Sequence, residues 1–174
     1  PMTKSADMIK TMDDGEMVSV SRKIAAPVDV VWQMVSDLSR MGDWSPENDG
    51  GSWRGADPTW PGGPSVGSVF RGDNHRGRRT WKTKVTVIDS DPPRRFAFRL
   101  KIGALGGCDW IYDIEPTDAG CCVTESWIDE RTRALKFVGW LFTGVSDRAS
   151  HNRANMEATL EHLAMAAEGV SRSD

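Results

Sequence analysis

The hydrophobic period of the chain changes from two to 3.6 residues at the sequence AAPVD, within residues 17–47. Before this corner, Val18, Val20 and Ile24 alternate with polar residues, as in a strand with one buried face. After it, apolar residues recur at helical spacing. Pro27 suits the first position of a helix, and Asp29 is favourable in the first turn. The chain therefore runs from a strand directly into a short helix, which predicts a sheet closed by helices.

The predicted helix has a single apolar face, which indicates that it packs against a core. Its residues at positions i, i+3, i+4, i+7 and i+10 are Val28, Val31, Trp32, Val35 and Leu38. Met41 and Gly42 are expected to end a second short helical turn.

The segment that follows, residues 43–65, is rich in glycine and proline and has no hydrophobic period. Long irregular segments in compact domains are often lids or binding loops. The segment contains Trp44, Trp53 and Trp60, and burial of each indole is worth about 1.5–3 kcal/mol. We therefore favour a packed lid over a disordered insertion.

Five runs of alternating residues then predict an antiparallel meander: 66–75, 79–90, 95–102, 108–116 and 121–131. The breaks between them carry turn residues. With the first strand, the period alone gives six strands. Alternation assigns most of the large aromatic residues to one face of the sheet. These residues are Phe70, Trp81, Phe98, Trp110, Tyr112 and Trp127.

The last predicted element is an amphipathic helix from about Val145 to Glu168. Asn152 and Met156 lie on its inward stripe. Its second half is apolar, whereas its first half contains Arg148 and other polar residues. A helix that is dry at one end and polar at the other predicts a pocket with unevenly distributed polar groups.

Several segments together resemble the SRPBCC superfamily, the helix-grip group, and most of all its bacterial polyketide cyclase/dehydrase-like members. They are KIAAPVDVVWQMVSD, GDWSPE, VGSVFRG, DPPRRFAF and CDWIYDIEPTDAGCCVTESW, in an ordered series over residues 16–168. The resemblance implies an α+β fold: a curved antiparallel sheet of about seven strands, two short helices after the first strand, and a long C-terminal helix packed across the sheet over a hydrophobic cavity. The additional strand comes either from division of a long strand or from the Trp-rich loop.

We expect one domain at residues 16–168, with a flexible arm at 1–15 and a tail at 169–174. Lys and Arg total 22 against 25 Asp and Glu, a net charge of −3, which gives no reason to expect nucleic-acid binding. No apolar run approaches the roughly 20 residues of a membrane span, so we expect no integral membrane association and a cytoplasmic location. The expected assembly is a monomer or homodimer.

No cofactor motif is present, and the three cysteines, Cys108, Cys121 and Cys122, lack the paired spacing of a zinc site. Neighbouring residues of a strand point to opposite faces, so Cys121 and Cys122 are not expected to bind one metal together. We therefore expect neither a metal nor a cofactor.

Glu125 is the candidate catalytic residue. Alternation places it inward, between Val123 and Trp127, where burial would raise its pKa and prepare it to orient a ligand carbonyl or to act as a general acid or base. A bulge near Gly120 would instead turn it outward into solvent. Arg79 also falls on the inward face, either as a further polar group in the cavity or as part of a solvated hairpin tip.

The expected function is binding of a hydrophobic or aromatic small molecule, lipid-, polyketide- or quinone-like, in an internal cavity. The candidate ligand-binding residues are Trp44, Phe70, Arg79, Trp81, Phe98, Trp110, Tyr112, Glu125, Trp127, Asn152 and Met156. Two alternatives remain open. One is a polyketide cyclase/dehydrase-type enzyme that uses the cavity carboxylate. The other is a co-chaperone-like or ribosome-associated interaction module that docks through the outer sheet face, where Lys82, Lys84, Arg99 and Lys101 cluster.

Overall fold

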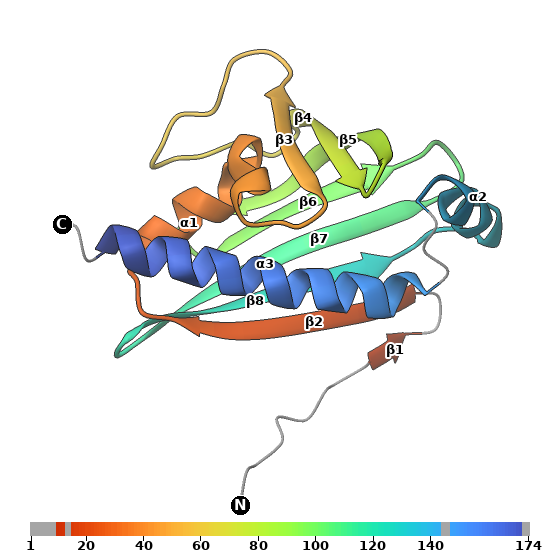
Figure 1. Ribbon diagram of the computed structural model, residues 1–174. Helices are drawn as coiled ribbons and strands as arrows, with labels where there is room; N and C mark the ends of the chain where they lie inside the picture. The colour runs from red at the N-terminus through yellow and green to blue at the C-terminus, as the bar shows by residue number, and fades with distance from the viewer. Residues whose placement is uncertain (1–9, 13–14, 144–146, 172–174) are drawn as a thin grey trace, which may run out of the picture.

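The computed structural model describes residues 10–12, 15–143 and 147–171. A curved antiparallel sheet carries one long helix across its concave face (Figure 1). The strands lie in the order β1-β2-β8-β7-β6-β5-β4-β3. Their bounds are β1 Lys10–Met12, β2 Gly15–Ile24, β3 Asn48–Trp53, β4 Val69–Arg76, β5 Arg79–Asp91, β6 Arg95–Lys101, β7 Gly107–Thr117 and β8 Gly120–Asp129. This arrangement confirms the helix-grip α+β fold.

Two short helices follow β2, as the sequence predicts: α1 Val28–Ser36 and the 3-10 helix η1 Leu38–Asp43. The last helix, α3, spans Arg148–Ser171, so it begins later than predicted and continues into the expected tail. Residues 144–146, which contain the predicted start at Val145, lie outside the described residues. None of the described helices is both long and apolar enough to cross a membrane.

Three elements differ from the expectation. β3 forms inside the Trp-rich loop, so this loop supplies the additional strand, and its pairing with β4 is irregular between Asn48 and Gly51. The periodicity misses β3 because residues 50 and 51 are glycines, which carry no alternating pattern. α2 Arg133–Thr143 forms where only a connector was expected, and β1 pairs with β2 within the predicted arm.

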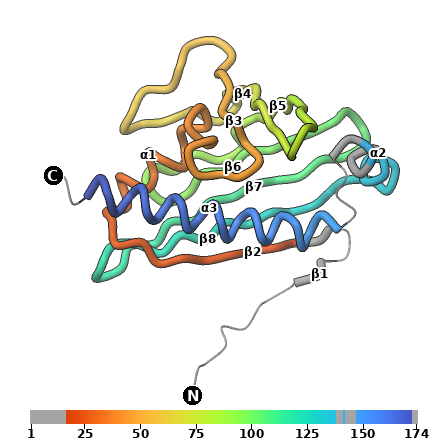
Figure 2. Tube along the Cα trace, viewed as in Figure 1, coloured from red at the N-terminus to blue at the C-terminus, as the bar shows by residue number. Residues whose placement is uncertain are grey.

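The rest of the Trp-rich loop packs on α1. The indole Nε1 of Trp32 donates a hydrogen bond to the carbonyl of Pro61 at 3.2 Å, and the indole Nε1 of Trp60 donates to Ser36 Oγ at 3.0 Å. Figure 2 traces this loop on the outer side of α1. Residues 54–65 of the loop are thus tied to a helix, and none of them lines the cavity described below.

The C-terminal half of α3 is closely packed. Leu160, Leu163 and Ala167 have no exposed surface and join a core cluster with residues of α1 and of the central strands. The chain trace in Figure 2 shows this half of α3 beside α1. This contact anchors the helix on the sheet and thereby fixes the position of its N-terminal half.

We predict that Leu163→Ala lowers the free energy of unfolding by about 2–5 kcal/mol, because it leaves a cavity in this anchored core. The matched control is Met165→Ala on the same helix, where the side chain is 68% exposed, and its effect should stay within about 0.5 kcal/mol. Urea unfolding of both variants tests this. Equal losses would mean that α3 is not anchored through Leu163.

Candidate functional site: a cavity beneath the long helix

A cavity of about 610 Å³ lies between the sheet and the N-terminal half of α3. Its walls come from β4 to β8, while Leu38, Met41 and the segment 45–48 close one side. α3 contributes Arg148, Asn152, Asn155, Met156 and Thr159. The closely packed half of α3 and the hollow half are therefore successive parts of one helix.

Most of the residues predicted to contact a ligand line this cavity. They are Phe70, Trp81, Phe98, Trp110, Tyr112, Glu125, Trp127, Asn152 and Met156. Strand pairing brings the central ones together, since Trp110 lies opposite both Phe98 and Trp127 in the sheet. The rings of Trp110 and Trp127 are 6.3 Å apart at an interplanar angle of 44°. These indoles form a tilted aromatic wall.

Trp44 and Arg79 lie elsewhere. Trp44 is 2% exposed and packs in the core at the end of η1, where its carbonyl lies 3.0 Å from His162 Nδ1. Arg79 lies opposite Arg76 at the tip of the β4-β5 hairpin, beyond the rim of the cavity. Its guanidinium is exposed and donates to the carbonyl of Leu141 on α2 at 3.3 Å. Neither side chain lines the cavity, so both are removed from the candidate ligand contacts, and Arg79 takes the hairpin-tip position that the sequence left open.

Glu125 faces inward. The pairing of β7 with β8 is continuous from Cys108 opposite Asp129 to Thr117 opposite Gly120, without a bulge that would turn the carboxyl outward. Glu125 lies between Val20 on β2 and Tyr112 on β7, and is 2% exposed.

The carboxyl of Glu125 is held in its neutral form at neutral pH. Burial raises its pKa to about 8, although the hydrogen bond that Tyr112 Oη donates to Oε1 at 2.9 Å lowers it. Burial also raises the pKa of Tyr112 well above its usual value, and Glu125 raises it further. The pair is thus an uncharged polar site within an apolar wall.

Three lining residues present buried polar atoms that have no hydrogen-bond partner among the described residues. They are Glu125 Oε2, Asn152 Nδ2 and one terminal nitrogen, NH1, of Arg148. Buried polar atoms in proteins are almost always satisfied, because an unmade hydrogen bond costs about 1–3 kcal/mol. Three such atoms around one cavity are typical of a site that a ligand or ordered water completes.

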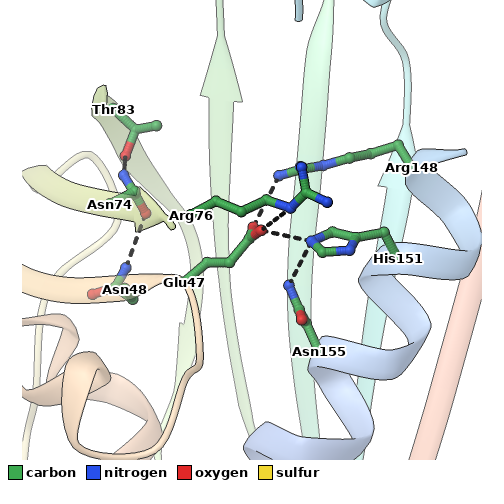
Figure 3. Close-up of polar contacts among 8 residues, drawn as sticks. All are labelled: Glu47, Asn48, Asn74, Arg76, Thr83, Arg148, His151 and Asn155. Atoms are coloured by element: carbon green, nitrogen blue, oxygen red, sulfur yellow. Dashed lines mark hydrogen bonds and ion pairs between the residues drawn. The ribbon is translucent and has the colours of Figure 1, made fainter. Parts of the chain in front are cut away.

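A second polar cluster joins the loop after η1 to the first turns of α3 (Figure 3). The Glu47 carboxylate lies 2.6 Å from His151 Nε2, 3.4 Å from Arg148 NH2 and 3.8 Å from Arg76 Nε. Asn155 Nδ2 is 3.2 Å from the same His151 nitrogen. Because a carboxylate only accepts hydrogen bonds, His151 Nε2 must carry its hydrogen toward Glu47. Glu47 therefore holds three cationic or donor groups at the mouth of the cavity.

Glu47 and Arg148 were not among the residues predicted to line the cavity. Glu47 belongs to the GDWSPE segment that carried the family resemblance, and Arg148 opens the helix four residues before Asn152. The spacing of 148, 152 and 156 along one helical face is the signal that places Arg148 inward. Nothing in the local sequence connects Glu47 to α3, because the two segments are about 100 residues apart.

The family model for polyketide cyclase / dehydrase and lipid transport matches residues 16–168. The chain belongs to this family. No curated protein is significantly similar in sequence. Among solved structures, the Polyketide_cyc-like protein Cgl2372 of Corynebacterium glutamicum is 30% identical, with a TM-score of 0.55, and the match covers 92% of this chain and 94% of that protein.

Two more distant structures share the fold alone. The di-domain ARO/CYC StfQ of the steffimycin biosynthetic pathway has a TM-score of 0.69 at 16% identity, and the match covers 91% of this chain and 52% of StfQ. The chain therefore spans about half the length of StfQ. Major latex-like protein 151 of Panax ginseng has a TM-score of 0.66 at 13% identity, with 88% and 98% of the two chains covered.

We predict that Glu125→Gln stabilises the protein at alkaline pH. Near pH 4, residue 125 is neutral in the wild type and in the variant. Above the ordinary pKa of 4.5, unfolded wild type loses the Glu125 proton, whereas folded wild type keeps it up to about pH 8, so unfolding of the wild type becomes more favourable as the pH rises. Each pH unit in this window costs the wild type about 1.4 kcal/mol relative to the variant, and the difference levels off above pH 8.

Urea unfolding at pH 5, 7 and 9 measures this difference. Ser126→Ala, a neutral change at the adjacent residue of β8, serves as the control and should shift stability equally at all three values. A difference between wild type and Glu125→Gln that does not change with pH would contradict a neutral, buried Glu125.

Proposed function

We propose that this protein binds a hydrophobic or aromatic small molecule in the cavity beneath α3. The observation that carries the proposal is the hollow of about 610 Å³ itself, which lies within the usual range of about 300–1,000 Å³ for ligand sites. Family membership agrees with this use of the cavity.

The walls favour a flat or polycyclic ligand. Phe98, Trp110 and Trp127 supply broad apolar surfaces, and Met156 on α3 supplies a side chain that adapts to irregular shapes. On the same face of the sheet, two residues farther along β7 and β8 from the indoles, Tyr112 and Glu125 provide one polar point deep in the wall. A ligand with a rigid apolar body and few polar atoms matches this distribution.

A docking role for the outer face has weaker support. The guanidinium of Arg99 donates two hydrogen bonds of 2.6 Å to the carboxylate of Asp109, and Lys82 contacts Asp73. These pairs neutralise half of the basic cluster that the interaction hypothesis needs. The cyclase alternative stays a prediction, with Glu125 as its acid or base.

We predict that N-phenyl-1-naphthylamine, a neutral aromatic probe, binds the protein and gains fluorescence. Leu100→Trp should lower its affinity at least ten-fold, because Leu100 lines the cavity and the larger side chain fills it. The matched control is Val66→Trp, at a position that is 63% exposed and outside the cavity lining, which should bind as the wild type does. Equal binding by Leu100→Trp and the wild type would refute a ligand in this cavity.

A further inference from the structure

The polar atoms of the cavity that lack partners are all placed to donate hydrogen bonds. Arg148 NH1 and Asn152 Nδ2 carry hydrogens and cannot accept. The neutral Glu125 carboxyl accepts from Tyr112 at Oε1, so its hydrogen belongs on Oε2, the oxygen without a partner. The cavity thus offers donors, and a ligand that satisfies them must bring acceptors.

The two donors on α3 share one face of the helix. Arg148 and Asn152 are four residues apart, so their side chains lie one turn above the other. Asn152 is 2% exposed, and both residues line the cavity. Two adjacent N–H donors, one of them charged, match the paired oxygens of a carboxylate.

The charged groups that reach the cavity also favour an anion at Arg148. Lys82, Lys84 and Lys101 have exposed side chains on the outer face of the sheet, so they do not charge the cavity. Asp129 pairs with Arg131. Of the two acidic lining residues, Glu47 lies at the mouth and Glu125 is neutral at pH 7. Arg148 is therefore the cation that a ligand in the cavity can reach, and no charged carboxylate lies deep in the wall to repel an anion.

Glu47 does not fully compensate Arg148. Its nearer contact is His151, and its distance to Arg148 NH2 is 3.4 Å. Burial lowers the pKa of the Arg148 guanidinium, which means that its charge is incompletely stabilised in the absence of a ligand. A carboxylate at NH1 would supply the missing counter-charge without displacing Glu47, because Glu47 contacts the other terminal nitrogen.

We propose that the ligand of this cavity is an aromatic acid, whose carboxylate binds Arg148 and Asn152 and whose rings lie against Trp110 and Trp127. This inference rests on the proposed function, since it names the chemical class of the ligand for the same site. It assigns Arg148 to recognition of the ligand, in addition to its contact with Glu47.

Isothermal titration at pH 7 with naphthalene-2-carboxylate and with its neutral isostere naphthalene-2-carboxamide tests the proposal. The wild type should bind the carboxylate at least ten-fold more tightly than the amide. Arg148→Met should remove this preference by weakening the carboxylate at least ten-fold, while amide affinity stays within about two-fold. Asn152→Leu should weaken the carboxylate several-fold, and Lys23→Met, a loss of charge at an exposed position of β2, should change neither affinity.

Binding of N-phenyl-1-naphthylamine to the wild type and to each variant separates failure of the acid proposal from failure of the proposed cavity function. If the wild type binds this neutral probe but does not prefer the carboxylate, the acid proposal is overturned while the cavity function stands. Equal losses of both naphthalene ligands in Arg148→Met would also overturn it, because Arg148 would then be structural. If the wild type does not bind the neutral probe, the proposed function itself fails.

Discussion

The contact between α3 and the concave face of the sheet determines the rest of this structure. Over its C-terminal half, Leu160, Leu163 and Ala167 meet the core without gaps. Over its N-terminal half, polar Arg148 and Asn152 replace such residues, and the sheet opposite carries indoles that do not fill the space. A helix that is anchored at one end can leave a hollow at the other without loss of the fold, because the cost of an unfilled interior is offset by the packed half.

The same contact explains how polar groups are tolerated inside. Glu125 sits between a tyrosine hydroxyl and apolar walls, where a carboxyl is stable only as the neutral acid. Glu47, by contrast, remains at the mouth beside His151, Arg148 and Arg76, where several donors stabilise a charge. Two carboxyl groups that line one cavity therefore present opposite chemistry, one as a donor and one as an acceptor.

The sequence predicted most of the fold, because alternation and helical spacing report which side chains are buried. It placed Trp110, Tyr112 and Glu125 on one face, and the structure shows them there. It missed β3, whose two glycines remove the pattern. It left Arg79 open between the cavity and the hairpin tip, because parity identifies a face but not the distance from the tip.

The mouth of the cavity was less predictable for a different reason. The contact of Glu47 with Arg148 and His151 joins segments about 100 residues apart, and no local period reports such a contact. The Trp-rich loop was correctly expected to pack, yet its partner, α1, became known only from the tertiary structure.

The most direct test of the central claim, a ligand-sized hollow beneath α3, is to locate a bound molecule by nuclear Overhauser effects. With N-phenyl-1-naphthylamine bound to isotope-labelled protein, the account predicts contacts from the probe to the Met156 methyl group and to the indole protons of Trp110 and Trp127. Contacts confined to Phe137 and Leu141, which are exposed on the surface of α2, would contradict it.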